Sequence, residues 1–324
     1  MFWISTLLMA CVQPEQIEPN RPNPVDKTVT GTTQTVSDRE TADTGTPPAD
    51  LCPGTLPNVS GIYDDTSFVT EEDFDFDGGG FLLTQSNSNI SALDREGNVE
   101  IISIPGFHDP SGIRVLSTGD IALAEPDTGG LRVVYRATGA TEIVMSGLTN
   151  PNGVAADSGG YVYVSEFTPN GRVAIIDPYT AENWLIADDL PTPNGLALSN
   201  DESKLYILTD NSIMVTERLG PTSFGPLSVF TPLPAGTSFW SLTLDICDNI
   251  YTVNYTSGEV VRITADGMST EILTDISEFG SFSALRFGGG EGGWERETLY
   301  VTSRQKLFAV PIGLAGKPPV APVY

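Results

Sequence analysis

Two Pro-Asn-Gly triplets, starting at Pro151 and Pro193, open the same short pattern and constrain the fold more than any other feature of the sequence. Each triplet precedes an apolar run, a turn containing Gly, Asp or Ser, and a second run rich in Tyr, Val, Ile and Leu, which is typical of a β-hairpin. The same pattern recurs elsewhere in the chain. Six residues correspond to the asparagine of the triplet and are here called the first-position residues. They are Glu72, Ser111, Asn152, Asn194, Trp240 and Ser283, at steps of 39, 41, 42, 46 and 43 residues.

A regular period of about forty residues, with four short strands per repeat, predicts the blades of a β-propeller. Six repeats fill nearly all of the 324-residue chain after residue 51, so we expect an all-β, six-bladed propeller over residues 51–324. The last predicted strand, Lys306–Ile312, ends the sixth repeat. Residues 51–68 are expected to supply the strand that closes the ring, because an open stack of blades would leave sheet edges unpaired.

The charge of the chain limits its partners. Sixteen Lys and Arg residues stand against 42 Asp and Glu, a formal net charge of −26. Such a surface repels phosphate backbones and anionic lipid headgroups, which argues against binding of nucleic acid and against electrostatic docking on a membrane. Most of the acidic residues lie in the repeats, where they either simply keep the domain soluble or favour a divalent cation.

The N-terminal segment predicts export. Residues 1–11, MFWISTLLMAC, resemble the lipobox of bacterial lipoproteins, which implies a signal peptide over residues 1–10 and a lipidated Cys11. The alternative is a buried strand or helix, but the polar sequence that follows gives the run nothing to pack against. Residues 12–50, rich in Thr, Pro, Asp, Glu and Gln, are expected to be a disordered tether. We therefore expect a protein of the bacterial cell envelope, periplasmic or at the outer-membrane surface, that touches the membrane through its lipid alone.

Two cysteines remain if Cys11 carries a lipid. Export would place Cys52 and Cys247 in an oxidising compartment, where two leftover thiols are usually paired. We predict a Cys52–Cys247 disulfide between the start of the folded region and the fifth repeat. The alternative is two unrelated buried thiols.

The repeats place two rings of residues on one face of the propeller. The first and second strands of a blade are antiparallel, so the start of the first and the end of the second lie together. The inner ring consists of the six first-position residues named above, hereafter the ring residues. The outer ring consists of the residues that follow the second strands, all polar or acidic: Gln85, Glu125, Glu166, Asp210, Asn254 and Ser303. Carboxylate and amide oxygens that converge on one axis suit hard cations such as calcium or magnesium.

The repeats resemble the senescence marker protein/gluconolactonase family of six-bladed propellers, with paraoxonases and strictosidine synthase as distant relatives. The resemblance covers about residues 66–316 and rests on NPNGVAAD, TPNGLALSNDESKLYILTD, LDICDNIYTVNYTSGEVVRI and FGGGEGGWERETLYVTS. It implies a divalent metal on the central axis held by Glu72, Asn152 and Asn194, with calcium preferred and zinc or magnesium as alternatives. The family's fourth ligand, an aspartate, is replaced by Trp240, whose indole cannot bind a hard cation.

Two further family positions differ in this chain. Ser111 stands where paraoxonase-like relatives have a histidine base, and Asn150 stands where the family has an arginine that contacts substrate. Lactone hydrolysis requires a group that polarises the carbonyl and a base that activates water. Glu166, Asp210 and the loop residue His108 are the candidate catalytic groups. For Asn152 and Asn194 the alternative is local, since Asn between Pro and Gly is a favoured turn residue.

Two functions follow from these features. The first is a metal-dependent hydrolase of lactones or related esters. The second is a propeller that has lost catalysis and binds a small ligand, a glycan or an envelope protein, with Ser111, Trp240, Ser283 and Asn150 lining the pocket. An aromatic at the centre of a pocket favours the second, because it can stack on sugars or flat rings. In both cases we expect a monomer.

The acidic run at Asp73, Asp75 and Asp77 imitates the start of a calcium-binding EF-hand loop. Thr84 stands where that loop requires a glutamate, and Phe74 and Phe76 alternate with the aspartates. The run therefore predicts a strand.

Overall fold

The computed structural model describes residues 52, 59, 63–65, 72–86, 89–104, 106–107, 110–276, 281–303 and 306–320, all within the compact unit Thr44–Tyr324. The predicted signal peptide, Cys11 and the tether lie outside these residues, and so does His108. No helix in the described part of the chain is long and apolar enough to cross a membrane.

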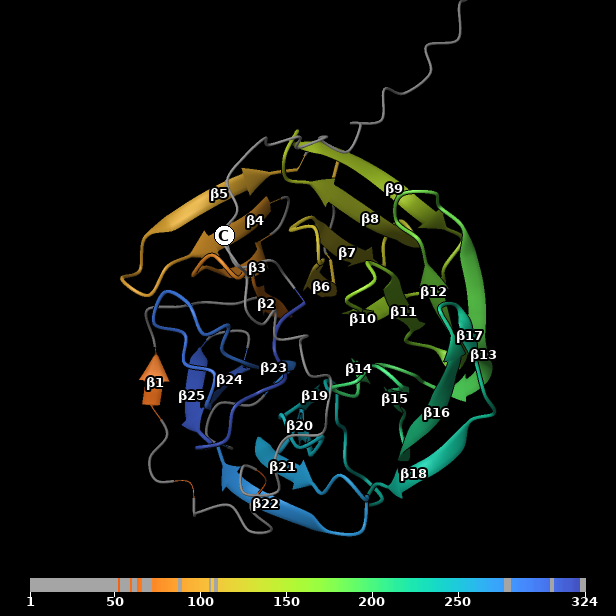
Figure 1. Ribbon diagram of the computed structural model, residues 1–324. Helices are drawn as coiled ribbons and strands as arrows, with labels where there is room; N and C mark the ends of the chain where they lie inside the picture. The colour runs from red at the N-terminus through yellow and green to blue at the C-terminus, as the bar shows by residue number, and fades with distance from the viewer. Residues whose placement is uncertain are drawn as a thin grey trace, which may run out of the picture. The chain divides into compact units, whose positions relative to one another are not determined.

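The described strands form six antiparallel sheets arranged around a central hub, as Figure 1 shows. The innermost strands are β2 (Phe74–Phe76), β6 (Gly112–Val115), β10 (Pro151–Ala156), β14 (Leu196–Leu198), β19 (Thr243–Leu244) and β23 (Ala284–Phe287). The second strands are β3 (Leu82–Ser86), β7 (Ile121–Glu125), β11 (Val162–Glu166), β15 (Lys204–Leu208), β20 (Ile250–Val253) and β24 (Thr298–Thr302). The prediction of an all-β, six-bladed propeller is confirmed.

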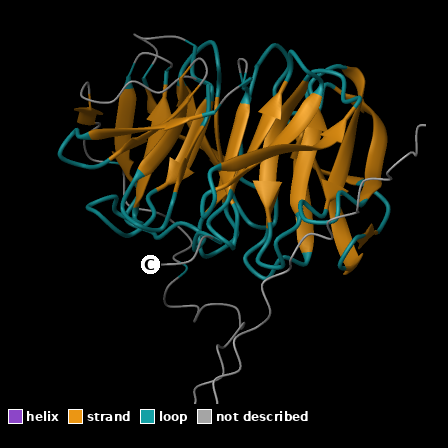
Figure 2. Ribbon diagram, turned by 90° about the horizontal axis from the view of Figure 1, so that it is seen from above, coloured by secondary structure: helices purple, strands orange, loops and turns teal. Residues whose placement is uncertain are grey.

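The outer strands complete the blades. The third strands are β4 (Asn89–Leu93), β8 (Gly130–Tyr135), β12 (Pro169–Ile176), β16 (Ser212–Gly220), β21 (Glu259–Ile263) and β25 (Leu307–Pro311). The outermost are β5 (Val99–Ser103), β9 (Ala140–Ser146), β13 (Asn183–Pro191), β18 (Ser228–Pro232) with the short β17 (Ser223–Phe224), β22 (Thr270–Asp275) and β1 (Tyr63–Asp65). Figure 2 shows the sheets from the side, with loops gathered at their two ends.

A strand from before the first blade closes the ring by joining the sheet of the last blade. Strand β1 pairs antiparallel with β25, in the register Tyr63 opposite Ala309, and thereby becomes the outermost strand of the sixth blade. The predicted closure by the segment before the first repeat is confirmed. It leaves β25, the last strand of the chain, with a partner on both sides.

The hydrophobic core lies between the blades. Six apolar clusters bury their side chains, and each joins two neighbouring sheets. Alternate residues of one strand face opposite neighbours: Val154 packs toward the second blade and Ala155 toward the fourth. Strands buried on both faces explain the continuous apolar runs in the sequence.

Aspartates fix the turns between the first and second strands. A carboxylate oxygen of Asp157 accepts the Tyr161 amide at 2.8 Å, and one of Asp245 accepts the amides of Cys247 and Asn249 at 2.8 and 3.0 Å. Asp77 accepts backbone amides in the same way in the first blade. The run that imitates an EF-hand thus contributes the strand Phe74–Phe76 and the turn after it, as expected.

The disulfide is present. Cys52 and Cys247 are joined across a sequence separation of 195 residues. The prediction is confirmed, and the two unrelated thiols of the alternative are excluded. The bond ties the segment before the propeller to the turn between β19 and β20.

Candidate binding site at the hub

All six ring residues meet at one small cavity, hereafter the ring cavity. Its volume is about 20 Å³, and its lining consists of Glu72, Asp73, Ser111, Arg114, Asn152, Gly153, Asn194, Gly195, Trp240, Ser241, Ser283 and Arg286. The innermost strands all start at this end, so the ring residues, which lie at or shortly before the start of each strand, reach the same end of the hub. Glu72, Asn152 and Trp240 remain partly exposed, so the cavity reaches the surface.

The glycines of the ring are required by crowding between blades. A Cβ on Gly153 would lie 2.0 Å from the carbonyl oxygen of Asn194, and one on Gly112 would lie 2.1 Å from that of Asn152. Both glycines have ordinary negative φ angles, because neither is among the positive-φ glycines of the described chain. The glycine of each pattern therefore serves the close approach of neighbouring strands at the hub.

A buried ion cluster that the sequence reasoning missed forms the inner end of the ring cavity. Asp73 is only 7% exposed and accepts hydrogen bonds from Arg114 Nη1 at 2.8 Å and from Arg286 Nη2 at 3.2 Å. Nη1 of Arg286 donates to Ser241 Oγ at 2.9 Å, which links the sixth blade to the fifth. Burial raises the pKa of Asp73, and the charge on Arg114 opposes that rise. The two arginines share Asp73, and the lining also holds Glu72, so two acidic residues stand against two basic ones.

The two arginines of this cluster occupy the same position in their repeats. Arg114 and Arg286 each stand three residues after a ring residue, Ser111 and Ser283. The equivalent residues of the other blades are Asp75, Ala155, Ala197 and Thr243. Both faces of an innermost strand are buried, so a charged residue within such a short apolar strand indicates a buried ion pair.

Three aromatic side chains gather at the ring. The indole of Trp240 stacks on the Tyr255 ring with centroids 4.1 Å apart and planes 13° apart, and Phe167 lies 5.5 Å from the same indole. Trp240 Nε1 donates to Ser238 Oγ at 3.0 Å, which fixes the orientation of the indole. All three rings are half-buried. Together they form an aromatic surface beside the ring cavity.

Two ring residues carry buried polar atoms that have no hydrogen-bond partner among the described residues. These atoms are Asn194 Nδ2 and Ser283 Oγ, on residues that are 3% and 5% exposed. They belong to the fourth and sixth blades and so flank Trp240, which belongs to the fifth. A buried donor without a partner costs about 1–3 kcal/mol, and a ligand that supplies the acceptor recovers that cost.

The candidate catalytic carboxylates do not line the ring cavity. Glu166 accepts Arg172 Nε at 2.8 Å and the Thr149 amide at 2.9 Å. Partial burial by itself raises the pKa of Glu166, but the hydrogen bonds from Arg172 and Thr149 outweigh it and lower the pKa. A carboxylate held in this way is a weak base. Asp210 is exposed and accepts Thr192 Oγ1 at 2.8 Å.

Other outer residues have structural partners as well. Glu125 is fully buried and pairs with Arg132. Asn254 Oδ1 accepts the amides of Thr256 and Ser257. Asn150 adopts a left-handed φ of 49°, and its side-chain amide donates to the Phe167 carbonyl at 2.7 Å, so it shapes the loop beneath the aromatic surface and is not part of the cavity lining. Gln85 and Ser303 hold buried polar atoms without partners.

The ring cavity does not fit a divalent cation. Among the ring residues Glu72 is the one carboxylate, Trp240 offers no oxygen, and Asp73 is committed to two arginines. Calcium requires about six to eight oxygen ligands, and two guanidinium groups in the same lining would repel it. Within the described ranges no group of three or more His, Cys, Asp or Glu side chains is placed to hold a metal ion.

Fold and site together define a six-bladed propeller with a polar and aromatic cavity at its hub. Residues 109–305 match the family described as the SMP-30/gluconolactonase/LRE-like region, and the chain belongs to this family. The family predicted from the sequence motifs is thereby confirmed. No curated protein matches the sequence of this chain.

Solved structures share the fold at low sequence identity. A gluconolactonase from Xanthomonas campestris has a TM-score of 0.63 at 16% identity, over 80% of this chain and 95% of that one. A calcium-binding protein, regucalcin, from Agrobacterium tumefaciens has a TM-score of 0.62 at 18% identity, over 83% and 97%. A luciferin-regenerating enzyme has a TM-score of 0.64 at 13% identity, over 80% and 98%. At these identities the similarity establishes the fold.

Proposed function

We propose that the propeller binds a small hydroxylated ring compound, such as a sugar or sugar acid, at the ring cavity, and that it does so without a catalytic metal. The observation that carries this proposal is the pair of unpartnered atoms, Asn194 Nδ2 and Ser283 Oγ, on either side of Trp240. A ligand that lies against the indole would meet one fixed donor and one hydroxyl at its edge.

The size of the cavity sets how much of the ligand enters. A volume of about 20 Å³ admits a single polar group or one water molecule. The rest of the ligand therefore lies over the ring, against the aromatic surface of Phe167, Trp240 and Tyr255. The guanidinium groups of Arg114 and Arg286 in the lining suit an oxygen of the ligand, in a hydroxyl or a carboxylate, as the inserted group.

Hydrolysis of lactones is less well supported, although the name of one structural neighbour is gluconolactonase. Glu166 is held as a carboxylate by Arg172, and the ring offers one carboxylate where the family has more. The support for a metal is that Glu72, Asn152 and Asn194 line one cavity and that a neighbour is described as calcium-binding. The same experiment tests both functions.

Binding of gluconate and methyl β-glucoside to the full chain, measured by isothermal titration calorimetry, tests the proposal. Replacing Trp240 by Ala should weaken binding about three- to tenfold, the usual range for an aromatic contact, and Trp240→Phe should restore most of it. Ser283→Ala should weaken binding by a smaller factor. The matched control is Tyr179→Ala, which removes an exposed aromatic ring outside the site and should leave binding unchanged.

Two results would overturn the proposal. One is an affinity for both compounds that Trp240→Ala does not change. The other is turnover of glucono-1,5-lactone that requires added calcium, zinc or magnesium and is abolished by Glu72→Gln, which would establish the hydrolase instead.

We also propose that the chain is exported and attached to the bacterial envelope through a lipid on Cys11. The Cys52–Cys247 disulfide supports this, because such bonds persist in oxidising compartments. Expression with labelled palmitate should label the natural chain and leave Cys11→Ser unlabelled and released from the membrane fraction. Equal labelling of both chains would contradict the anchor.

A further inference from the structure

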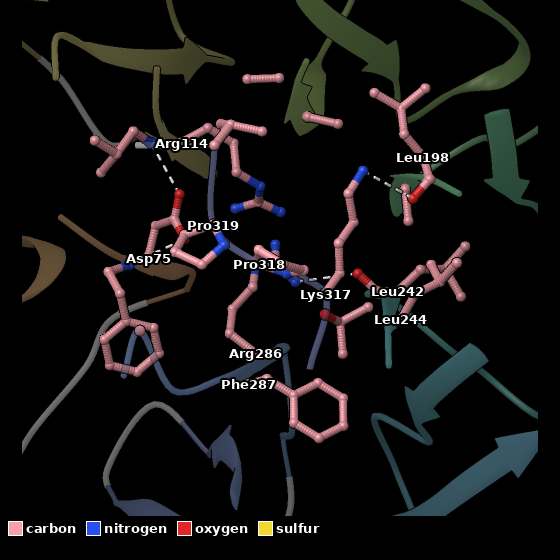
Figure 3. A pocket seen from close by; sticks show the side chains of 18 of the residues that line it. Asp75, Arg114, Leu198, Leu242, Leu244, Arg286, Phe287, Lys317, Pro318 and Pro319 are labelled. Carbon is pink, nitrogen blue, oxygen red and sulfur yellow. Dashed lines mark hydrogen bonds between the residues drawn. The ribbon is translucent and has the colours of Figure 1, made fainter. Parts of the chain in front are cut away.

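A second cavity lies at the far ends of the innermost strands and has no role in the function proposed above. This far cavity has a volume of about 130 Å³, and Figure 3 shows the side chains around it. It shares Arg114 and Arg286 with the ring cavity. Its outer wall is formed by Lys317, Pro318, Pro319 and Val320, near the end of the chain.

Three basic side chains face this cavity. Arg114, Arg286 and Lys317 line it together with Asp75. In Figure 3 the amine of Lys317 is turned toward the Leu198 carbonyl, to which it donates at 3.3 Å, and it lies 3.9 Å from Glu202. Both hydrogen bonds that Arg114 donates use Nη1, to Asp73 and to the Ile113 carbonyl. In the described part of the chain Nε and Nη2 of Arg114 donate none, so this guanidinium retains donors for a ligand.

The remaining lining is largely apolar. It consists of Phe76, Val115, Ala155, Ala156, Leu196, Ala197, Leu198, Leu242, Leu244 and Phe287, together with the two prolines. The volume of about 130 Å³ is comparable with the roughly 150 Å³ cavity that binds benzene in an engineered protein. The far cavity therefore has room for one small ring or a short branched chain.

The wall near the C-terminus is fixed in place. The Lys317 amide donates to the Leu244 carbonyl at 2.9 Å, and Lys317 Nζ donates to the Ser199 carbonyl at 2.8 Å. The isolated bridge between Asp245 and Gly316 holds the preceding residue against the fifth blade. This segment thus contributes a fixed wall to the cavity, with the Lys317 ammonium held by the Leu198 and Ser199 carbonyls and 3.9 Å from Glu202.

We propose that the far cavity is a binding site for a small organic carboxylate with an apolar body about the size of benzoate. The carboxylate would lie against Arg114, and the ring would lie among the alanine, leucine and proline side chains. The chemistry that supports this is the combination of retained guanidinium donors with an apolar space of that size.

Titration of the full chain with benzoate, with benzyl alcohol as the neutral analogue, tests this site. We expect benzoate to bind at least about tenfold more tightly, since charge-assisted hydrogen bonds are roughly twice as strong as neutral ones. Arg114→Gln should remove most of this preference. Asp75→Asn should strengthen benzoate binding, because it removes the one negative charge that lines the cavity. A merely structural role for Asp75 would not produce that gain.

The controls separate this site from general effects. Arg136→Gln removes an arginine that pairs with Asp77 outside the cavity, and it should leave benzoate binding unchanged. Ala156→Leu narrows the cavity without changing its charge and should abolish benzoate binding. This variant tests the location of the site even if Arg114→Gln does not fold. Trp240→Ala should have no effect here. Equal affinity for benzoate and benzyl alcohol, no measurable binding of benzoate, or binding that survives Ala156→Leu would refute the site.

Discussion

Replacing Asp75 by asparagine should stabilise the propeller relative to the natural chain, by an amount that grows as the pH rises. The Asp75 carboxylate accepts the Val115 amide at 2.8 Å and the Phe76 amide at 3.0 Å. Burial nevertheless raises its pKa from 3.8 to about 6, with Arg114 opposing the rise. A rise of this size corresponds to about 3 kcal/mol in the free energy of unfolding.

The sign follows from proton binding. Between the two pKa values the folded chain binds a proton at Asp75 that the unfolded chain does not. The stabilisation of the folded chain by this proton is therefore complete below pH 3.8 and is lost as the pH rises through about 6. Asparagine cannot titrate, so the variant keeps its stability over this range. Between about pH 4.5 and 7.5 the stability of the variant relative to the natural chain should increase by about 2 kcal/mol.

Urea unfolding of both chains at these two pH values measures the effect. Because the other acidic groups are common to both chains, their contributions cancel in the difference. Asp94→Asn is the control: hydrogen bonds from Asn98 lower the pKa of Asp94 below its usual 3.8, so its contribution is already complete above that pH and the relative stability of this variant should stay nearly constant between the two pH values. A stability difference for Asp75→Asn that does not change with pH would refute the reasoning.

Three further predictions concern the hub and the disulfide. Gly153→Ala should destabilise the propeller by about 1–3 kcal/mol because its Cβ would overlap the neighbouring blade, whereas Gly225→Ala, with its nearest contact at 3.6 Å, should change urea stability little. Asp73→Asn leaves two buried arginines without their carboxylate and should cost about 3–5 kcal/mol by the same assay; a cost below 1 kcal/mol would contradict the role of the cluster. Cys247→Ser should lower the free energy of unfolding by about 2–5 kcal/mol, and a reducing agent should produce the same loss in the natural chain but none in the variant.

The positions of the ring residues could be predicted because the repeat fixes their register. Glu72 and Ser283 are far apart in sequence, but each precedes an innermost strand, and every innermost strand starts at the same end of the hub. The regular spacing therefore places the six ring residues at one cavity even where the residue types differ from the family, whereas Asn150, also predicted for the pocket, is not part of its lining. The disulfide could be predicted because two cysteines remain to pair if the chain is exported with a lipid on Cys11.

The chemistry within the cavity was harder to predict. Arg114, Arg286 and Asp73 come from three different blades, and no local pattern shows that they meet. Glu166 is a candidate catalytic group because it lies close to where the family has an acidic residue that contacts substrate. Its partner Arg172 lies across the following hairpin, and this contact commits the carboxylate to the blade itself. Phe167 and Tyr255 directly follow outer-ring residues, so extending that ring by one position would have found the aromatic surface.

Closure of the propeller by β1 has a consequence for how the protein associates when its disulfide is reduced. Strand β1 pairs with β25, and the Cys52–Cys247 disulfide ties the segment before β1 to the fifth blade. Reduction would leave a three-residue strand as the closing piece. Once it detaches, the backbone of β25 becomes an unpaired edge that a second copy of the chain can extend. Reducing conditions should thus favour oligomers joined at this seam before they unfold the blades.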